Sequence, residues 1–496
     1  MTDIRIYKQD ELHIRIETER SIQYELNEHF SFYVKDYKFM PQYKSGLWDG
    51  KIRLFNLATN LLPSGLLIDL VKFCKAYEYS YEIVDKEALK PIQFEDEINE
   101  FLENIPQVTK LPPKGEYQYQ LDSVIKCLKL NKSLVLSPTG SGKSHIIYLI
   151  VRFLLQYTDE NILICVPTTS LDEQMVSDFS SYVNDGFDID SECHKVYSGK
   201  EKQTKKRIVV TTWQSIYRLP NDWFKRFGVF ICDEAHQADS KSITKIISNL
   251  SHCRFRYGFT GTLDGTKTHE LSLRGMFGVV IKTTTTKKLM NEGVLANLAI
   301  DVVILKYQKD ECKDVYMNHR KYHDEIRWLV EHKKRNQYII ATALSQKNNT
   351  LVLFNFIDHG NKLYEMALKY ADQFKKEVHF IHGNVDVEER ERVRRIVETK
   401  NNIIIFASYG TFSTGINMKN LHTVIFAHPF KARIRNLQSI GRTLRKSTGK
   451  EKAKLIDIGD DLSYNNKNNV TFEHLIERMK IYESEQFEYE LKKQQL

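Results

Sequence analysis

Short apolar runs alternate with amphipathic stretches in two separate parts of the chain. Between residues 132 and 262, four runs are apolar at nearly every position, as in strands buried on both faces: 133–136, 162–166, 207–211 and 229–232. A second series follows residue 340, with runs at 350–354, 377–381, 402–406, 423–426 and 453–457. Because the segments between the runs have helical spacing, the pattern predicts two tandem α/β domains, each a parallel sheet flanked by helices.

The first 100 residues have a different pattern. Residues 4–16 alternate between apolar and polar positions like a hairpin, and residues 66–77 have the spacing of an amphipathic helix. The turn-forming sequence Pro112-Pro113-Lys114-Gly115 separates this region from the first series of apolar runs. We therefore expect four parts: a small N-terminal α+β accessory domain (1–100), a first α/β domain (101–295), a charge-dense helical connector (296–340), and a second α/β domain ending in a polar surface helix (341–496).

Composition excludes several classes of protein. The 496 residues are 42% hydrophobic and 27% charged, which is typical of a folded chain of about three domains. No apolar stretch approaches the 18 or so residues of a membrane span, and the N-terminus lacks the layout of a signal peptide, so we expect a cytoplasmic protein without a membrane partner. The seven cysteines are scattered without a C-x-x-C pair, which predicts reduced thiols and neither zinc nor disulfides. The net charge of +8 permits an anionic partner without identifying one.

A glycine-rich loop comes directly after the run 133–136 and leads into a helical stretch. In this strand-loop-helix context, backbone N–H groups wrap phosphates, Lys143 reaches the β and γ oxygens, and the Ser144 hydroxyl is offered to Mg²⁺. The alternative is a structural turn that is merely rich in glycine, which this context disfavours. We predict ATP and Mg²⁺ as ligands, with the ATP-binding residues Ser137, Pro138, Thr139, Gly140, Ser141, Gly142, Lys143 and Ser144.

Two carboxylates come directly after the apolar run 229–232. In a parallel sheet this end of a strand lies beside the phosphate loop, where Asp233 would hold Mg²⁺ together with Ser144, and Glu234 would act as the base for the attacking water. Alone, the pair also fits ordinary helix capping. The phosphate loop upstream in the sequence favours the catalytic interpretation of the two carboxylates.

Cations in the second α/β domain are candidates for contact with the γ-phosphate. Arg442 and Arg445 are three residues apart and therefore share one helix face. Arginines of this kind stabilise charge that develops in the transition state of phosphoryl transfer. By themselves they fit a solvated or nucleic-acid-binding face equally well, and the phosphate loop favours the catalytic interpretation.

Taken in order, these motifs resemble those of the DEAH-type superfamily 2 helicases, from about Tyr117 to Asp457. Residues 166–171 resemble motif Ia, 211–214 motif Ib, 407–417 motif V and 438–445 motif VI. The resemblance implies two RecA-like domains with ATP in the cleft. It further implies catalytic roles for Lys143, Asp233, Glu234, His236, Gln438, Arg442 and Arg445, ATP contacts by Gln120 and Gly415, nucleic-acid contacts by Thr168, Thr169, Thr211, Thr212, Trp213, Ser408 and Thr411, and coupling through Thr260, Gly261 and Thr262.

The whole chain is also similar to the UvsW recombination helicases of T-even bacteriophages, in particular over residues 39–54, 233–236, 409–415 and 440–446. This resemblance implies ATP-driven unwinding or branch migration of branched DNA and R-loops in recombination, repair and replication. The implied partners are branched DNA, single-stranded DNA and RNA–DNA hybrids, with a phage single-strand-binding protein or recombinase as candidate protein partners. We expect a monomer in the host cytoplasm.

Two other functions remain open from the sequence. A duplex DNA translocase uses the same motifs without separating strands. A non-catalytic annealing protein or recombination mediator would keep a vestigial nucleotide site, although intact Lys143, Asp233, Glu234 and Arg442 argue against such decay.

Two basic concentrations are candidate nucleic-acid surfaces. Residues 431–454 hold nine Lys or Arg against the single acid Glu451. Near the N-terminus, five cations are interleaved with aromatic residues between 33 and 53. Cations beside exposed aromatics suit a duplex or a branch point, but aromatics at this density are equally at home in a core. Hydroxyl side chains in the loops at 168–170, 211–212 and 408–414 suit phosphate contacts or helix caps.

Overall fold

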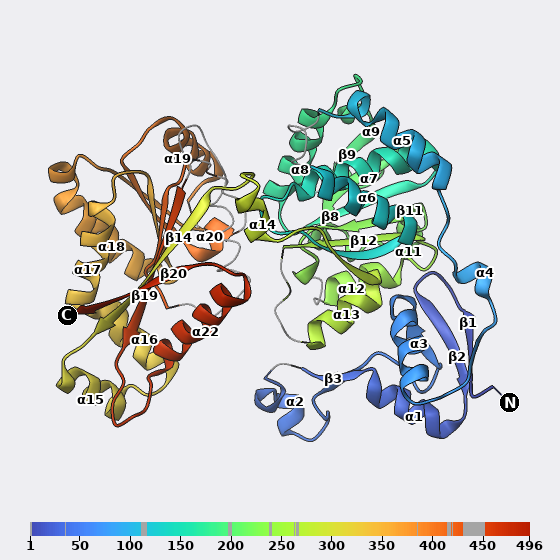
Figure 1. Ribbon diagram of the computed structural model, residues 1–496, viewed down its shortest axis with the longest axis horizontal. Helices are drawn as coiled ribbons and strands as arrows, with labels where there is room; N and C mark the ends of the chain where they lie inside the picture. Colours follow the sequence, from blue (N-terminus) through green and yellow to red (C-terminus); the bar gives the residue numbers. More distant parts are fainter. Residues whose placement is uncertain are drawn as a thin grey trace. The chain divides into compact units, whose positions relative to one another are not determined.

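The computed structural model describes residues 2–34, 36–110, 117–196, 201–237, 241–261, 263, 267–383, 385–413, 418, 420–429 and 452–496. The described residues form two compact units, one of residues 1–137 with 142–283 and the other of residues 138–141 with 284–496. The first unit contains an N-terminal module and the first α/β domain, and the second unit contains the second α/β domain (Figure 1).

The N-terminal module is built on a four-stranded sheet in the order β5-β2-β1-β6. Its strands are β1 (Ile4–Lys8), β2 (His13–Thr18), β5 (Leu61–Pro63) and β6 (Tyr81–Ile83), and its helices are α1 (Arg20–His29), η2 (Ser64–Leu66), α3 (Leu67–Ala76) and α4 (Lys86–Leu89). Ile4, Ile6, Ile14 and Ile16 are fully buried against α1 and α3. The hairpin and helix expected at 4–16 and 66–77 are therefore present.

A two-stranded ribbon extends from this module. It pairs β3 (Ser31–Tyr33) with β4 (Lys51–Arg53), and the connection carries η1 (Tyr37–Phe39) and α2 (Pro41–Lys44). We refer to residues 31–53 as the ribbon segment. In Figure 1 it runs outward from the sheet, with α2 at its far end.

The first α/β domain has a seven-stranded parallel sheet in the order β13-β7-β12-β11-β8-β10-β9. Its strands are β7 (Lys132–Leu136), β8 (Asn161–Val166), β9 (Cys193–Val196), β10 (Ile208–Thr212), β11 (Phe227–Cys232), β12 (Phe255–Thr260) and β13 (Val279–Lys282). Its helices are α5 (Glu95–Val108), α6 (Gln118–Leu130), α7 (Lys143–Tyr157), α8 (Thr169–Tyr182), α9 (Ile189–Glu192), α10 (Trp213–Ile216), α11 (Asn221–Phe224), η3 (Ala235–Gln237), α12 (Lys241–Ser248) and α13 (Lys267–Phe277).

Both faces of this sheet are covered, which explains the continuous apolar runs in the sequence. Successive residues of one strand enter two different cores: Val135 packs with α5 to α8, whereas Leu134 packs with α10 to α13. Because every side chain of such a strand is buried, the polar alternation of a half-exposed strand is absent.

The second α/β domain also has a seven-stranded parallel sheet, in the order β16-β17-β15-β18-β19-β14-β20. Its strands are β14 (Asn297–Lys306), β15 (Thr350–Phe354), β16 (Glu377–Ile381), β17 (Ile403–Ser408), β18 (Thr423–Phe426), β19 (Lys452–Asp461) and β20 (Tyr489–Gln495). Its helices are α14 (Thr286–Asn291), α15 (Lys309–Asn318), α16 (Tyr322–Glu331), α17 (Lys333–Ser345), α18 (Ile357–Ala371), η4 (Asp372–Phe374), α19 (Val387–Thr399), α20 (Tyr409–Ser413) and α22 (Val470–Ser484). The predicted fold class of two parallel sheets flanked by helices, preceded by a small α+β region, is confirmed.

Two segments differ from their expected roles. Residues 297–306, expected within the connector, form the long strand β14 between β19 and β20, because their apolar positions complete the core of the second sheet. The tail forms the helix α22 and then β20 at the sheet edge, where charged residues are suitable because one side of the strand faces solvent. No helix in the described part of the chain has the length and hydropathy needed to cross a bilayer.

The N-terminal module is fastened to the first α/β domain around Glu11. The Glu11 carboxylate accepts hydrogen bonds from Lys8 and Lys132, and its backbone carbonyl accepts from Lys132 and from Nη2 of the buried Arg256 at 2.8 Å. Burial opposes ionisation of Glu11, but the lysines outweigh it and lower its pKa. A second contact joins Arg274 of α13 to both carboxylate oxygens of Asp69. Lys132 and Arg256 stand at the starts of β7 and β12, so the module is anchored to two central strands.

Two ion pairs are fully buried in the second α/β domain. Arg478 of α22 contacts Asp457 of β19 at 2.8 Å, and Tyr482 donates a hydrogen bond to the same carboxylate. Arg335 of α17 pairs with Asp460 in the same way. Removal of one member of such a pair leaves its partner charged and buried.

Asp457→Asn is therefore expected to lower the free energy of unfolding of the second domain by about 3–5 kcal/mol, because Arg478 loses its counter-charge. Glu389→Gln breaks the solvent-exposed pair with Arg392 and serves as the control, with no measurable change. Urea unfolding followed by circular dichroism measures both variants. Equal midpoints for the two variants would contradict the role of the buried pair.

Candidate ATP site and nucleic-acid interface

The phosphate loop connects the end of β7 to the start of α7. Ser137 opens the loop and donates its N–H to the carbonyl of Thr260 at 2.9 Å, which ties the loop to the neighbouring strand β12. Gly140 and Gly142 have φ values of +86° and +79°, in the left-handed region that favours glycine. At Gly142 a Cβ would also lie 2.3 Å from the Nε2 of Gln120. The 15-residue helix α7 therefore begins at a glycine turn, and its positive end suits an anion.

Lys143 is held between the two carboxylates at the end of β11. Its Nζ lies 3.0 Å from Oδ1 of Asp233 and 2.7 Å from Oε1 of Glu234. Although burial opposes the charged form, the two carboxylates raise the pKa of Lys143 above its usual value. Burial also opposes the charged form of Glu234, which would raise its pKa. Lys143 and His236 outweigh this effect and lower the pKa of Glu234 below its usual value. The structure thus keeps Lys143 and Glu234 ionised, which suits a phosphate ligand and a general base respectively.

A line of contacts continues from Glu234 to β12. The Nδ1 of His236 lies 3.2 Å from Oε2 of Glu234 and 2.9 Å from Oγ1 of Thr260. Glu234 has a φ of +51°, a strained conformation for a residue with a side chain, and such strain concentrates at functional sites. Lys143, Glu234, His236 and Thr260 therefore form one contact line, which joins the phosphate loop to the end of β12.

Gln120 and Ser144 have partners that the sequence did not indicate. Oε1 of the buried Gln120 lies 2.7 Å from Nδ1 of His145, and burial lowers the pKa of His145 to about 4, so the imidazole is neutral. The Ser144 hydroxyl lies 2.9 Å from that of Tyr182. His145 therefore positions Gln120. In the sequence, the position of His145 directly after Ser144 is the one indication that it belongs to this site.

The donor types at the loop fit Mg²⁺ bound with a nucleotide. Mg²⁺ in such sites takes one or two protein oxygens and completes its shell with phosphate oxygens and water. The Ser144 hydroxyl and the Asp233 carboxylate are oxygen donors of this kind. In the described part of the chain no cluster of three or more His, Cys, Asp or Glu is arranged to hold a metal ion.

The predicted nucleic-acid contacts divide into two groups. Thr169 is exposed, Thr168 caps α8 by accepting from the Leu171 N–H, and Thr212 shares a hydrogen bond with Ser215. By contrast, Thr211 is fully buried and donates to the carbonyl of Val196, and Trp213 is 5% exposed within the core. The Thr211 and Trp213 side chains are therefore packed within the domain, and contact of this segment with nucleic acid through backbone N–H groups or side chains stays a prediction.

Predicted residues of the second domain are only partly described. The hydroxyl of Ser408, at the end of β17, lies 2.7 Å from that of the buried Thr411 in α20. Gly415, Gln438, Arg442 and Arg445 lie outside the described residues, as does Thr262 of the first domain. Gly261 comes directly after Thr260 and is partly buried.

Asp172 is a buried carboxylate that no pattern in the sequence indicated. It lies in the first turn of α8, is fully buried, and neither carboxylate oxygen has a hydrogen-bond partner. Burial, with a contribution from Glu173, raises its pKa to about 7. The side chain therefore stores a desolvation penalty one turn from the predicted contact loop at Thr168 and Thr169.

This penalty predicts a pH dependence of stability. Because the pKa of Asp172 is higher in the folded chain than in the unfolded chain, the free energy of unfolding falls as pH rises from about 4 to about 7. Asp172→Asn is expected to remove part of this fall and to stabilise the first domain at pH 8 by roughly 1–3 kcal/mol. Denaturant unfolding of both proteins at pH 5 and pH 8 measures the effect. A variant that is less stable at pH 8 than at pH 5, by the same margin as the wild type, would exclude this role.

Three known families match consecutive parts of the chain. Residues 3–85 match the family described as the N-terminal region of the DNA helicase UvsW, residues 98–265 the type III restriction enzyme res subunit, and residues 332–447 the conserved C-terminal domain of helicases. The last two ranges correspond to the two α/β domains, and the first corresponds to the N-terminal module.

Similar proteins and structures extend over the whole chain. The ATP-dependent DNA helicase uvsW of Enterobacteria phage T4 is 35% identical over 511 aligned residues, which cover 99% of each chain. The DNA 3'-5' translocase XPB2 of Sulfurisphaera tokodaii is 22% identical, over 79% of this chain and 91% of its own. The crystal structure of T4 UvsW matches with a TM-score of 0.52 and 32% identity, covering 100% of both chains. Because the T4 relative is 35% identical over 99% of both chains, the chain belongs to the UvsW family of DNA helicases.

Proposed function

We propose that this protein is an ATP-dependent DNA helicase that unwinds or branch-migrates branched DNA and R-loops in recombination, repair and replication. The observation that carries this proposal is the contact line from Lys143 through Glu234 and His236 to Thr260. This line connects the residues suited to ATP hydrolysis with the end of β12, through which hydrolysis would be coupled to the unwinding of DNA. Kinship with T4 UvsW, named as an ATP-dependent DNA helicase, supports the same function.

ATP binding would change the partners of Lys143. In the structure its ammonium group neutralises Asp233 and Glu234. A triphosphate in the loop offers Lys143 competing oxygens, and Mg²⁺ would add charge stabilisation for the transferred phosphoryl group. Lys143 would then bind phosphate, and Asp233 and the Ser144 hydroxyl would supply oxygens to the metal. Glu234, without Lys143 to lower its pKa, would be a stronger base for a proton from water.

The change would reach DNA through His236 and Thr260. When Glu234 exchanges Lys143 for water, the contact that His236 makes with it is altered, and His236 also touches Thr260. We propose Gln438, Arg442 and Arg445 as residues that meet the γ-phosphate from the second domain, and Gln120 and Gly415 as further nucleotide contacts. A cycle of this kind can do work only because ATP and its products favour different conformations.

The DNA strand would be held by backbone N–H groups and short hydroxyl side chains. Thr168, Thr169, Thr212 and Ser408 lie at or just after the carboxyl ends of parallel strands, where phosphates can approach. We propose single-stranded and branched DNA as direct partners and RNA–DNA hybrids as a second substrate. A phage single-strand-binding protein or recombinase would act as an accessory partner of a monomer in the host cytoplasm.

A duplex translocase that does not separate strands is the alternative function. The similarity to a protein named as a DNA translocase, over 79% of this chain, is the observation that favours it. Displacement of a labelled strand from a fork reports strand separation, whereas displacement of a third strand from a triplex reports translocation alone. Triplex displacement without strand displacement would select the alternative.

Lys143→Ala is the variant that tests the proposed function. Loss of the ammonium group removes charge stabilisation of the phosphates, so DNA-stimulated ATPase and unwinding should both fall by about 10²-fold or more. Forked DNA, a four-way junction and an R-loop are the substrates, and Lys126→Ala, in the exposed part of α6, is the matched lysine control. Unwinding by Lys143→Ala at the wild-type rate would refute the proposed function.

A further inference from the structure

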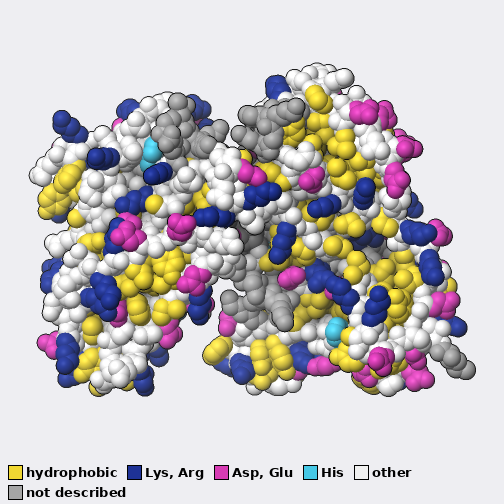
Figure 2. Space-filling view, in the orientation of Figure 1, with side chains coloured by type: hydrophobic (Ala, Val, Ile, Leu, Met, Phe, Trp, Pro, Cys, Tyr) yellow, Lys and Arg dark blue, Asp and Glu magenta, His cyan; other side chains and the backbone are white. Residues whose placement is uncertain are grey.

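Two large apolar side chains of the ribbon segment are left in solvent. Leu47 is 84% exposed and Phe39 is 75% exposed, the two highest values among the large hydrophobic residues that the structure describes. Figure 2 shows hydrophobic side chains gathered at the α2 end of the segment, with Lys and Arg side chains at their border. This exposure exceeds that of the other exposed apolar side chains of the module, of which Tyr77 is 56% and Tyr24 is 54% exposed, and it marks the α2 end as a candidate contact surface.

Ring contacts and a side-chain hydrogen bond join residues of the segment around them. The rings of Tyr33 and Tyr37 stack with their centroids 4.7 Å apart, and Tyr43 meets Tyr37 edge to face at 4.8 Å. The Nε1–H of Trp48 donates to the carbonyl of Lys51 at 2.8 Å. At Gly50, where φ is +85°, a Cβ would lie 2.1 Å from the Tyr37 ring. The tyrosines thus contact one another on a partly exposed segment, in which Tyr33 is 49% exposed and Phe39 and Leu47 are the most exposed apolar side chains.

The charges of the segment favour a polyanion. Lys51 pairs with Glu28 and Arg53 pairs with Asp49, so these four side chains neutralise one another. Lys38 and Lys44, which precede and follow Phe39 in the sequence, are exposed, as is the carboxylate of Asp36. An apolar pair flanked by cations matches a nucleic acid whose bases are open, because bases offer apolar faces and the backbone offers phosphates.

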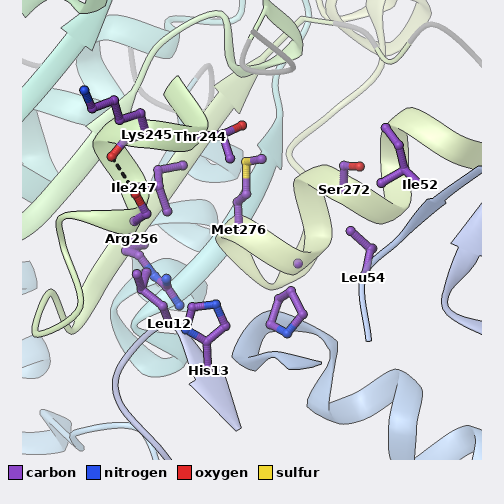
Figure 3. Close-up of a pocket in the computed structure, with 13 residues that line it drawn as sticks. Leu12, His13, Ile52, Leu54, Thr244, Lys245, Ile247, Arg256, Ser272 and Met276 are labelled. Carbon is purple, nitrogen blue, oxygen red and sulfur yellow. Dashed lines mark hydrogen bonds between the residues drawn. The ribbon is translucent and has the colours of Figure 1, made fainter. Parts of the chain in front are cut away.

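The base of the segment is also tied to the first α/β domain. Ile52 and Leu54 line a pocket of about 600 Å³ together with residues of that domain (Figure 3). The other labelled residues that line it are Leu12 and His13 of the module and Thr244, Lys245, Ile247, Arg256, Ser272 and Met276 of the domain. Beside this pocket, Arg256 binds the carbonyl of Glu11. The base of the segment therefore borders the same pocket as Arg256 of β12, the strand that ends at Thr260.

We propose that Phe39 and Leu47 pack against the faces of unpaired bases at a DNA branch point, while Lys38 and Lys44 bind the adjoining phosphates. This inference rests on the proposed helicase function and adds to it a place where the branch is recognised. Unpaired bases occur where duplex arms meet and are absent from a continuous duplex. The segment would therefore recognise a branch by the accessible faces of the unpaired bases there, and not by base sequence.

The double variant Phe39→Ala/Leu47→Ala tests the proposal in the full-length protein. Its affinity for a forked DNA without nucleotide should fall at least tenfold, whereas single-strand-stimulated ATPase should stay within twofold of the wild type. A 2-aminopurine base at the fork should change its fluorescence when the wild type binds and should not when the variant binds. The matched control is Ile68→Ala/Tyr77→Ala in the same module. Ile68 of α3 is 47% exposed and Tyr77, at the end of α3, is 56% exposed, and this variant should behave as the wild type.

Charge variants test the phosphate part separately. Lys38→Gln/Lys44→Gln should reduce the slope of log affinity for the fork against log salt by about 1–2. Unchanged fork affinity and an unchanged 2-aminopurine signal in Phe39→Ala/Leu47→Ala would overturn the proposal, as would equal losses of affinity for fork and single strand. Normal fork binding with lost self-association in sedimentation would assign the surface to a second copy and overturn it too. Because binding is measured without nucleotide, failure of the helicase function appears separately, as a wild type that binds forks but does not unwind them.

Discussion

The attraction between one ammonium group and two carboxylates organises the first α/β domain at its functional end. Lys143 begins α7, and Asp233 and Glu234 come directly after β11, so their contact joins two segments that are far apart in the sequence. Buried charges of this kind are stable only when they are paired. The same requirement makes the site responsive, because a triphosphate can replace the carboxylates as the partner of Lys143 without leaving that charge unpaired.

The central strands of this domain link the two functional regions. β7 runs from Lys132 to the phosphate loop, and β12 runs from Arg256 near its start to Thr260. The N-terminal module binds both strands at their starts through Glu11, while the nucleotide residues lie at their ends. A displacement at one end of such a buried strand is transmitted to the other, because close-packed interiors deform little. The module and the predicted nucleotide site are thus attached to opposite ends of the same two strands.

The sequence predicted those features that burial and spacing make visible. Strands such as β8 and β11 were found because both of their faces are covered, so nearly every residue is apolar. β12 was missed because Arg256 and Tyr257 interrupt its apolar run, and β20 because an exposed edge strand tolerates the lysines and glutamines of a surface helix. The phosphate loop and the carboxylates after β11 were located from local sequence alone. The contacts of Gln120 with His145, of His236 with Thr260, and the isolation of Asp172 depend on tertiary packing, which no local pattern records.

The number of base pairs unwound per ATP hydrolysed, compared between the wild type and Thr260→Val, most directly tests whether the contact line couples hydrolysis to DNA. Valine keeps the shape of threonine but removes the hydroxyl that meets His236, while Lys143, Asp233 and Glu234 keep their contacts. We expect DNA-stimulated ATPase to stay within about threefold and the base pairs unwound per ATP to fall about tenfold, which corresponds to roughly the free energy of one hydrogen bond. Unchanged coupling, or a parallel loss of ATPase and unwinding, would contradict a coupling role for the line from Lys143 to Thr260.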